Sequence, residues 1–318
     1  VQEVNITPTE GLFTERYLGG TGRDYDLFIQ GPQFFNGNLT IHPQEFRFLA
    51  WAAGSNVDAG SPSPYTHTIS AIQNNVATAF TSGTLNPFLS FGVEETAQAT
   101  GDGNNWQRTI KGCVVEEYEL AGAMGEMLEN NITFIGTSGT WASGAASTIN
   151  NFNFGTSAVG SIVPTNVAGG IIGRPYIFSD VTIQIPSGTT YETVTAFSFK
   201  LGNNLLAKPY LTGSRTYAAP QPTERDLTLD ITFDAQSERA KTLYETYYQG
   251  GSSFNTMLFI NALTGSQDCA IILSGCQIMD TFESVIPLVG LNEHTIHIRA
   301  KTFSAVVRDC VRLYNPWA

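Results

Sequence analysis

The chain has 318 residues and a formal net charge of −12, and only 14% of its residues are charged, against about 25% in ordinary soluble domains. An acidic chain without a cluster of Lys and Arg is not expected to bind nucleic acid by neutralising phosphates. No apolar stretch approaches the roughly 18 residues that a membrane-spanning helix needs. The low charge content predicts a surface that is largely covered by other subunits of an assembly.

The first part of the chain combines strand-like segments with one amphipathic helix. Apolar residues at helical spacing predict this helix over Pro43–Ala53, with Pro43 at its first position and Gly54 at its end. A long polar stretch, Ser55–Leu85, follows the helix and places His67 in a loop. The predicted strands of this part are Tyr25–Gln30, Asn38–Ile41, Pro87–Glu95, Gln107–Leu120 and Glu129–Gly136.

The second part follows a Gly-, Ser-, Ala- and Asn-rich segment, residues 139–180, which has little periodicity and is predicted to be a linker or crossover. Apolar and polar residues alternate strictly over Leu227–Phe233, as in a strand with one buried face. A second amphipathic helix is predicted over Ala235–Tyr248, with Asp234 as its cap. The other predicted strands are Val181–Ile185, Phe197–Leu201, Tyr210–Arg215, Thr256–Leu263, Cys269–Glu283 and Thr295–Lys301.

A glycine followed by a cysteine occurs twice, at Gly112-Cys113 and at Gly275-Cys276, each time inside a predicted strand that becomes acidic. A metal site, a disulfide or a duplicated domain would each explain the repeat. The same order of strands, helix and further strands surrounds both pairs, which favours duplication. The predicted fold is therefore mainly β, with two tandem domains that each carry one flanking α-helix. Their predicted bounds are 1–138 and 181–318, separated by the linker at 139–180.

The sequence contains no strong catalytic or metal-binding pattern. It lacks a nucleophile elbow, a zinc-protease helix and a phosphate-binding loop. His294 and His297 are three residues apart in a predicted strand, so they should point to opposite faces and not converge on a metal. The four cysteines include no C-x2-C pair, which favours free buried thiols over zinc ligands. We therefore expect no enzymatic activity, no metal and no cofactor.

Acidic residues cluster in corresponding strands of the two parts. Glu116, Glu117 and Glu119 follow the first Gly-Cys pair, and Asp280 and Glu283 follow the second. Paired carboxylates can perform acid–base chemistry, but a cluster without a neighbouring base or histidine is more typical of a solvated face. Its presence in both parts indicates a surface property of an assembly.

Several phrases resemble the tail tube proteins of long-tailed, siphovirus-type bacterial or archaeal viruses. In the first part these are "NLTIHPQEFRFLAWAAGS", "NPFLSFGVEE" and "RTIKGCVVEEYEL". In the second part they are "VTAFSFKLGNNLLAKPYLTGSRTY" and "RDLTLDITFDAQSERAKTLYETYYQGG". The resemblance covers about residues 10 to 302. It implies two tail-tube-type β-sandwich or barrel domains that form rings by joining their sheets, so that an inner barrel lines a lumen.

The resemblance also implies a function and partners. Rings would stack into a hollow virion tail tube that conducts double-stranded DNA during ejection, and a duplicated chain implies trimeric, pseudo-hexameric rings. The implied partners are further copies of the chain, a tape measure protein, and tail tip and terminator proteins, with DNA in transit only and no membrane. Assembly would take place in the host cytoplasm. The five clustered acids, Glu116, Glu117, Glu119, Asp280 and Glu283, are candidates for the lumen lining, where like-charge repulsion lets DNA slide.

The stretches Gly19–Gly37 and Gly202–Thr223 are candidates for contacts between stacked rings, and Ser55–Leu85 for outer-surface or stacking contacts. Two other functions remain open. The chain could be a ring or tube protein of a contractile tail or a secretion system. It could also be a carbohydrate-binding β-sandwich, in which tryptophans would stack on sugars, although these are dispersed at Trp51, Trp106, Trp141 and Trp317.

Overall fold

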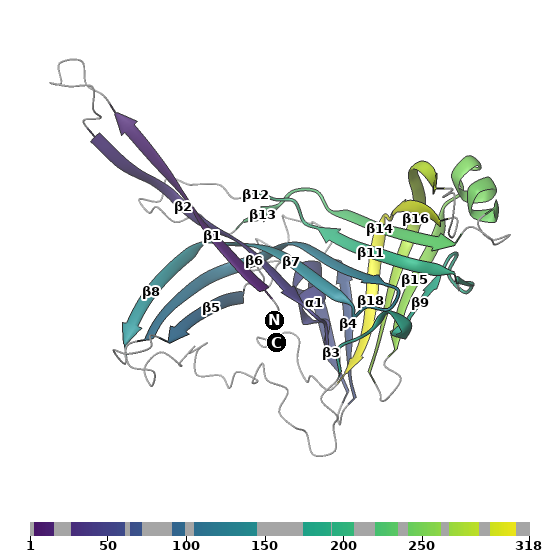
Figure 1. Cartoon of the computed structure of the whole chain (residues 1–318), viewed down its shortest axis with the longest axis horizontal. Coiled ribbons are helices and arrows are strands. Elements are labelled where there is room, and N and C mark those ends of the chain that lie inside the picture. Colours follow the sequence, from purple (N-terminus) through teal and green to yellow (C-terminus); the bar gives the residue numbers. More distant parts are fainter. Residues whose placement is uncertain are drawn as a thin grey trace.

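The structure is a computed structural model of the whole chain (Figure 1). It describes residues 3–15, 27–60, 64–71, 91–98, 105–144, 174–191, 193–206, 220–234, 241–261, 267–285 and 293–309. Strands dominate these residues, and the helices are short, as the sequence predicts for a mainly β fold.

The elements run in this order along the chain. The first part contains β1 (Glu3–Glu15), β2 (Leu27–Ile41), α1 (Arg47–Ala53), β3 (Gly54–Ala59), β4 (Tyr65–Ala71), β5 (Phe91–Gln98), β6 (Asn105–Ala123), β7 (Glu129–Gly136) and β8 (Ser138–Gly144). The second contains η1 (Phe178–Asp180), β9 (Val181–Gln184), β10 (Thr190–Tyr191), β11 (Val194–Gly202), β12 (Leu205–Leu206), β13 (Gln221–Pro222), β14 (Asp226–Asp234), η2 (Leu243–Gln249), β15 (Phe254–Asn261), β16 (Asp268–Val285), β17 (Glu293–Arg299) and β18 (Thr302–Asp309).

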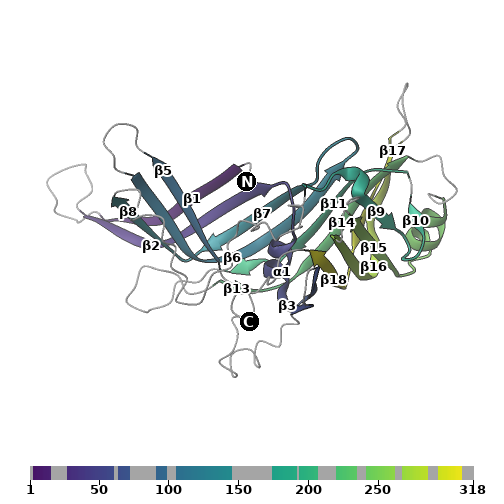
Figure 2. The ribbon, with the colours of Figure 1, turned by 90° about the horizontal axis from the view of Figure 1, so that it is seen from below.

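Eight antiparallel strands form what we call the main sheet, in the order β1-β2-β7-β6-β11-β14-β17-β16. The first four strands and the last four have the same order, since β1, β2, β7 and β6 correspond in turn to β11, β14, β17 and β16. The two four-stranded units join where β6 pairs with β11, from Ala123 opposite Ala196 to Glu117 opposite Gly202. Strands from the two units thus lie side by side in one continuous sheet (Figure 2).

The Gly-Cys pairs lie where β6 and β16 pass from an outer sheet into the main sheet. The residues before Gly112 pair with β5 and β8, and those before Gly275 pair with β15 and β18. Both glycines have φ +65°, a conformation that side chains rarely adopt. Cys113 lies opposite Phe91 and Cys276 opposite Phe254, each beside a register shift. The two pairs therefore occupy equivalent positions, and Cys113, Cys269 and Cys276 are free, buried thiols.

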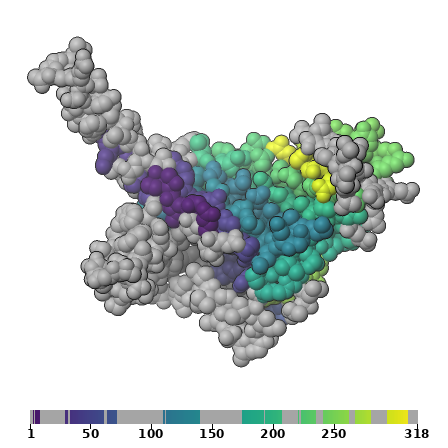
Figure 3. Space-filling view, in the orientation of Figure 1, coloured from purple at the N-terminus to yellow at the C-terminus, as the bar shows by residue number. Residues whose placement is uncertain are grey.

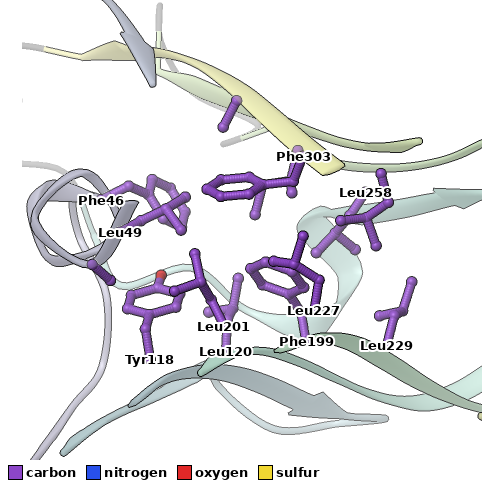
Figure 4. Packing of buried hydrophobic residues seen from close by; sticks show 14 of the residues in the cluster. Phe46, Leu49, Tyr118, Leu120, Phe199, Leu201, Leu227, Leu229, Leu258 and Phe303 are labelled. Carbon is purple, nitrogen blue, oxygen red and sulfur yellow. The ribbon is translucent and has the colours of Figure 1, made fainter. Parts of the chain in front are cut away.

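The core fills the space between the main sheet and the outer layer (Figure 4). Phe199, Leu201, Leu227 and Leu229 come from the buried face of the sheet, because the alternation of β11 and β14 turns every second side chain to that face. Phe303 of β18, with its ring centroid 6.3 Å from that of Phe199, lies above them. Each such side chain contributes about 1.5–3 kcal/mol when fully buried.

Three local expectations differ from the structure. The first helix begins at Arg47 rather than at Pro43, although Gly54 ends it in the left-handed conformation as predicted (φ 85°). Residues 31–37, which separate the predicted strands Tyr25–Gln30 and Asn38–Ile41, belong to β2, whose pairing with β1 extends well beyond its pairing with β7. The result is a hairpin that projects from the body (Figure 1). Strand β8 also lies in the segment predicted to be a linker.

The prediction that His67 lies in a loop is wrong. Residues 54–59 and 65–71 of the polar stretch form the hairpin β3–β4, and β4 pairs with β18 of the second part. His67 is fully buried in β4. The local sequence is polar because this hairpin lies at the margin of a sheet, where one face remains accessible to water.

Candidate functional site

The main sheet has a polar face opposite the core, and this face is the candidate functional site. Side chains that are opposite each other in an antiparallel sheet share a face, so the register defines its members. One row crosses all eight strands: Glu3, Thr40, Asn131, Glu119, Lys200, Thr228, Arg299 and Gln277. None of these eight side chains belongs to the buried core.

Hydrogen bonds between neighbouring strands order this face. Thr40 Oγ1 donates to Asn131 Oδ1 at 2.8 Å between β2 and β7. Ser198 Oγ donates to Glu119 Oε1 at 2.7 Å across the junction of the two units, and Lys200 Nζ lies 3.3 Å from the same oxygen. This junction is therefore secured by a backbone ladder and by a charge-assisted contact.

In the second unit, bases of β17 face acids of β14. His297 Nδ1 lies 2.7 Å from Asp230 Oδ1, and the Arg299 guanidinium donates to Asp226. Lys200 and Arg299 are the basic side chains that the described register places on this face, together with His297. The acids outnumber them: Glu3, Glu117, Glu119, Glu129, Asp226, Asp230, Asp234 and Glu293. The face is accordingly acidic, and both strong bases contact carboxylates.

The structure places the predicted acids in different environments. Glu117 and Glu119 lie on the polar face, and Glu117 is exposed. Glu116 falls in the register shift between Val115 and Glu117, so strand alternation does not assign it to that face. Burial and the neighbouring charge of Glu117 raise the pKa of the Glu116 carboxyl. Asp280 and Glu283 belong to β16, but their side chains lie outside the described part; the backbone of Glu283 is opposite Thr295.

Sequence reasoning missed most acids of the polar face. Asp230 and Asp234 alternate with the buried residues of Leu227–Phe233, so they could have been found by taking the polar half of that pattern. Glu3 was missed because β1 was not predicted. Pro8 interrupts the β-forming residues at the start of the chain, and proline occurs in sheets mainly at edges.

The main sheet has two open edges in the described part of the chain. One is the outer edge of β1, which pairs with β2 on its other side. The second is the outer edge of β16 beyond Gln277, where β16 pairs with β17 alone. Figure 3 shows the N-terminal strand, in purple, at the molecular surface. Open edges present unpaired backbone groups that can pair with another strand.

Comparison with protein families agrees with this architecture. A model for the family described as phage tail tube protein matches residues 20–271. The chain belongs to the phage tail tube protein family. A search among curated proteins returns no significant match. Membership of this family makes the chain a structural component of a viral tail. In this chain the tail tube fold has two four-stranded units with the same strand order.

The histidines and tryptophans that could bind a metal or a sugar are dispersed over this tail tube subunit. His294 stacks on Phe233 with ring centroids 6.0 Å apart, whereas His297 lies on the polar face, so the two histidines do point in opposite directions. Trp51 packs edge-on against Phe48 at 5.0 Å, within the helix. Within the residues that the structure covers, no group of His, Cys, Asp and Glu has the geometry to hold a metal, and no helix is long and apolar enough to cross a bilayer.

Proposed function

We propose that three copies of the chain form one ring of a siphovirus-type tail tube, with the polar face towards the lumen. The observation that carries this proposal is the β6–β11 junction, in which two four-stranded units of equal order join edge to edge. The main sheet of one chain then has an open β1 edge on the first unit and an open β16 edge on the second. Pairing β16 of one copy with β1 of the next would repeat the junction and pair both of these edges.

The internal junction also predicts the register between copies. Asn36 of β2 and Thr228 of β14 occupy equivalent places in the two units. Thr7 of β1 is opposite Asn36, and Lys200 of β11 is opposite Thr228. Thr7 therefore occupies the position of Lys200. Glu283 in β16 likewise occupies the position of Glu119 in β6. Since Lys200 is opposite Glu119, Thr7 of one copy should be opposite Glu283 of its neighbour.

The threefold ring follows from counting units. Two units per chain make a ring of three chains pseudo-sixfold, which is the ring that the family resemblance implies for a duplicated subunit. In such a closed ring each chain offers both edges and uses both, so no copy is left with an open edge. The domain bounds 1–138 and 181–318 remain part of this proposal, with β8 packed on the first unit.

The acidic lumen supports passage of DNA. Double-stranded DNA carries one negative charge per about 1.7 Å of axis and would adhere to a basic channel. On the polar face, Lys200 and Arg299 contact Glu119 and Asp226, so these bases are held against their own sheet. Glu117 and Glu119 remain our candidates for the lumen lining, and Glu116, Asp280 and Glu283 are proposed with them.

Stacking of rings would use the two ends of the strands. The β1–β2 hairpin projects from one end, where β12 and β13 also lie. At the other end, the turn between β6 and β7 exposes Met124 (68%) and Met127 (50%). We propose that these ends meet in consecutive rings. The tape measure protein, the tail tip and terminator proteins, and assembly in the host cytoplasm belong to the same proposal.

Cysteine cross-linking tests the register. Thr7→Cys and Glu283→Cys in one chain, in a Cys310→Ser background, place two thiols on directly opposite residues, about 4.5–5.5 Å apart at Cα. Oxidation of assembled protein should give closed covalent trimers in denaturing gels. Thr7→Cys with Gln277→Cys is the matched control: Gln277 is opposite Arg299 and Glu283 opposite Thr295, so four positions along β17 separate the two sites by about 13 Å, too far for a disulfide.

Electron microscopy of the same sample should show stacked rings with threefold symmetry. Equal cross-linking in the control, or tubes without cross-links in the test variant, would refute the register. A closed covalent species of two or six chains would refute the threefold ring while retaining the joining of the sheets.

A further inference from the structure

A second link joins the two parts of the chain in the outer layer. The hairpin β3–β4 leaves the first part after α1 and adds to β18 of the second part, with Tyr65 opposite Asp309 and Ser70 opposite Ser304. The β6–β11 junction lies in the main sheet, so the two parts are connected in both layers. Because β4 precedes β18 by more than two hundred residues, the link forms only when both parts are in place.

A buried charge cluster lies at this link. His67 of β4 is fully buried between two carboxylates: its Nδ1 is 2.5 Å from Asp58 Oδ1 on β3, and its Nε2 is 3.1 Å from Asp309 Oδ1 on β18. A neutral imidazole has one donor nitrogen and one acceptor nitrogen, whereas an ionised carboxylate only accepts. Both hydrogen bonds therefore require the doubly protonated ring. Loss of its proton would leave a carboxylate facing a lone pair in a buried site.

Other titratable groups lie near this cluster, at the start of α1, at Tyr176, and on β16 at Asp268 and Cys269. Glu45 and Arg47, before and at the start of α1, form an ion pair at 2.8 Å, and burial raises the pKa of the Glu45 carboxyl. Burial also raises the pKa of Tyr176 and of Cys269 on β16, both near Asp309. Burial alone would lower the pKa of His67, but its hydrogen bonds with Asp309 and Asp58 and their charges outweigh this effect and raise it to about 9.

In the described residues that follow η2, the second part has no counterpart of the hairpin β3–β4. Its helix η2 ends at Gln249, and only residues 250–253 separate it from β15. In the first part, the hairpin β3–β4 begins immediately at Gly54. Among the described residues, the outer link therefore occurs once, between the two parts of the chain, although the strand order of the main sheet is repeated.

We propose that β3–β4 is a latch that fastens the first part of the chain to the second and that is closed by the protonated side chain of His67. When His67 loses its proton at alkaline pH, the latch leaves β18 while the β6–β11 junction remains paired. The latch is a property of a single chain, so it does not depend on ring formation. In a ring it would make the junction inside each chain stronger than the junction between chains.

Amide hydrogen exchange of the full-length, unassembled chain tests this proposal. Protection factors, corrected for the intrinsic effect of pH, should fall by about tenfold or more between pH 8 and pH 10 for residues 65–71 and 303–309, since one pKa unit corresponds to a tenfold change in an equilibrium. Residues 117–123 and 196–202 of the main sheet should keep their protection over the same range.

Asp58→Asn removes one partner charge but retains a hydrogen-bonding side chain. It should move the release to lower pH by about one unit or more, because an opposite charge within contact raises a histidine pKa by about that amount. Asp230→Asn is the matched control, since Asp230 pairs with His297 on the polar face, and it should leave the release unchanged. NMR titration of histidine-labelled protein gives the pKa of His67 directly.

Unchanged protection of the latch at pH 10 would overturn the proposal, as would a His67 pKa below 7. Simultaneous loss of protection in the latch and in the main sheet would also overturn it, because the chain would then unfold as a whole. If Asp58→Asn fails to fold, the wild-type exchange profile and the His67 titration still decide the outcome.

Discussion

Substitution of Gly112 by alanine tests whether the Gly-Cys pair marks a constrained crossing between sheets. At φ +65° an alanine costs about 1–2 kcal/mol relative to an unstrained backbone. An added Cβ would also lie 2.3 Å from Thr137 Oγ1, so a neighbour must move. Overpacking of this kind costs about 1–3 kcal/mol. Gly112→Ala should therefore lower the free energy of unfolding by about 2–5 kcal/mol.

Two other glycines separate the backbone effect from the steric effect. Gly125 has φ 85° and nothing within 4 Å of an added Cβ, so Gly125→Ala should cost only the backbone term, about 1–2 kcal/mol. Gly275→Ala should fall between the two, because its nearest contact is the flexible Lys301 Cδ at 3.0 Å. Thr137→Ala removes the clashing oxygen and should recover part of the loss in the double variant.

Urea unfolding followed by tryptophan fluorescence measures these differences as shifts in midpoint at constant slope. A double-mutant cycle between Gly112→Ala and Thr137→Ala isolates the steric term. A Gly112→Ala variant that is no less stable than Gly125→Ala, or a cycle without coupling between positions 112 and 137, would refute a constrained crossing at Gly112.

Four further outcomes are expected. Phe199→Ala should lower the free energy of unfolding by about 3–5 kcal/mol in urea, since the ring is fully buried; a loss below 1 kcal/mol would contradict the core assignment. Asn203→Ala should cost about 1–3 kcal/mol, because its Nδ2 donates to the buried carbonyls of Ala52 (2.9 Å) and Val115 (3.1 Å); an unchanged urea midpoint would argue against this bridge. Because the pKa of His67 is raised from 6.5 to about 9 in the folded chain, its contribution to stability is complete below pH 6.5 and is lost as the pH rises through about 9. The melting temperature of the wild type should therefore fall over this pH interval, whereas that of His67→Asn should not. Glu117→Lys should preserve ring assembly but create salt-sensitive DNA binding in a filter assay. The slope of log K against log salt concentration should steepen by about 0.9 for each new phosphate contact, and binding that is independent of salt would contradict a lumen position.

Much of the main sheet could be predicted because the alternation of apolar and polar residues along a strand is a property of neighbouring positions in the sequence. The pattern of Leu227–Phe233 specified both a strand and its buried face, and β14 has this burial at every position. The repeated order of elements around Cys113 and Cys276 could also be read from the sequence, because the order of strands along a chain requires no knowledge of contacts between distant segments. Glu117 and Glu119 were found because the acids cluster in the sequence.

The sequence by itself determined where most strands of the main sheet lie and which of their side chains are buried, because both depend on the period of neighbouring residues. Only the tertiary structure decided which strands pair across the chain. His67 illustrates the difference: its polar surroundings predict a loop, but Asp309, 242 residues away, converts the site into a buried ion pair. The face of Glu116 cannot be read from strand alternation, because Glu116 falls in a register shift between Val115 and Glu117, where an added residue interrupts the pairing. Pairing energy belongs to the contact between distant segments, and no single segment encodes it.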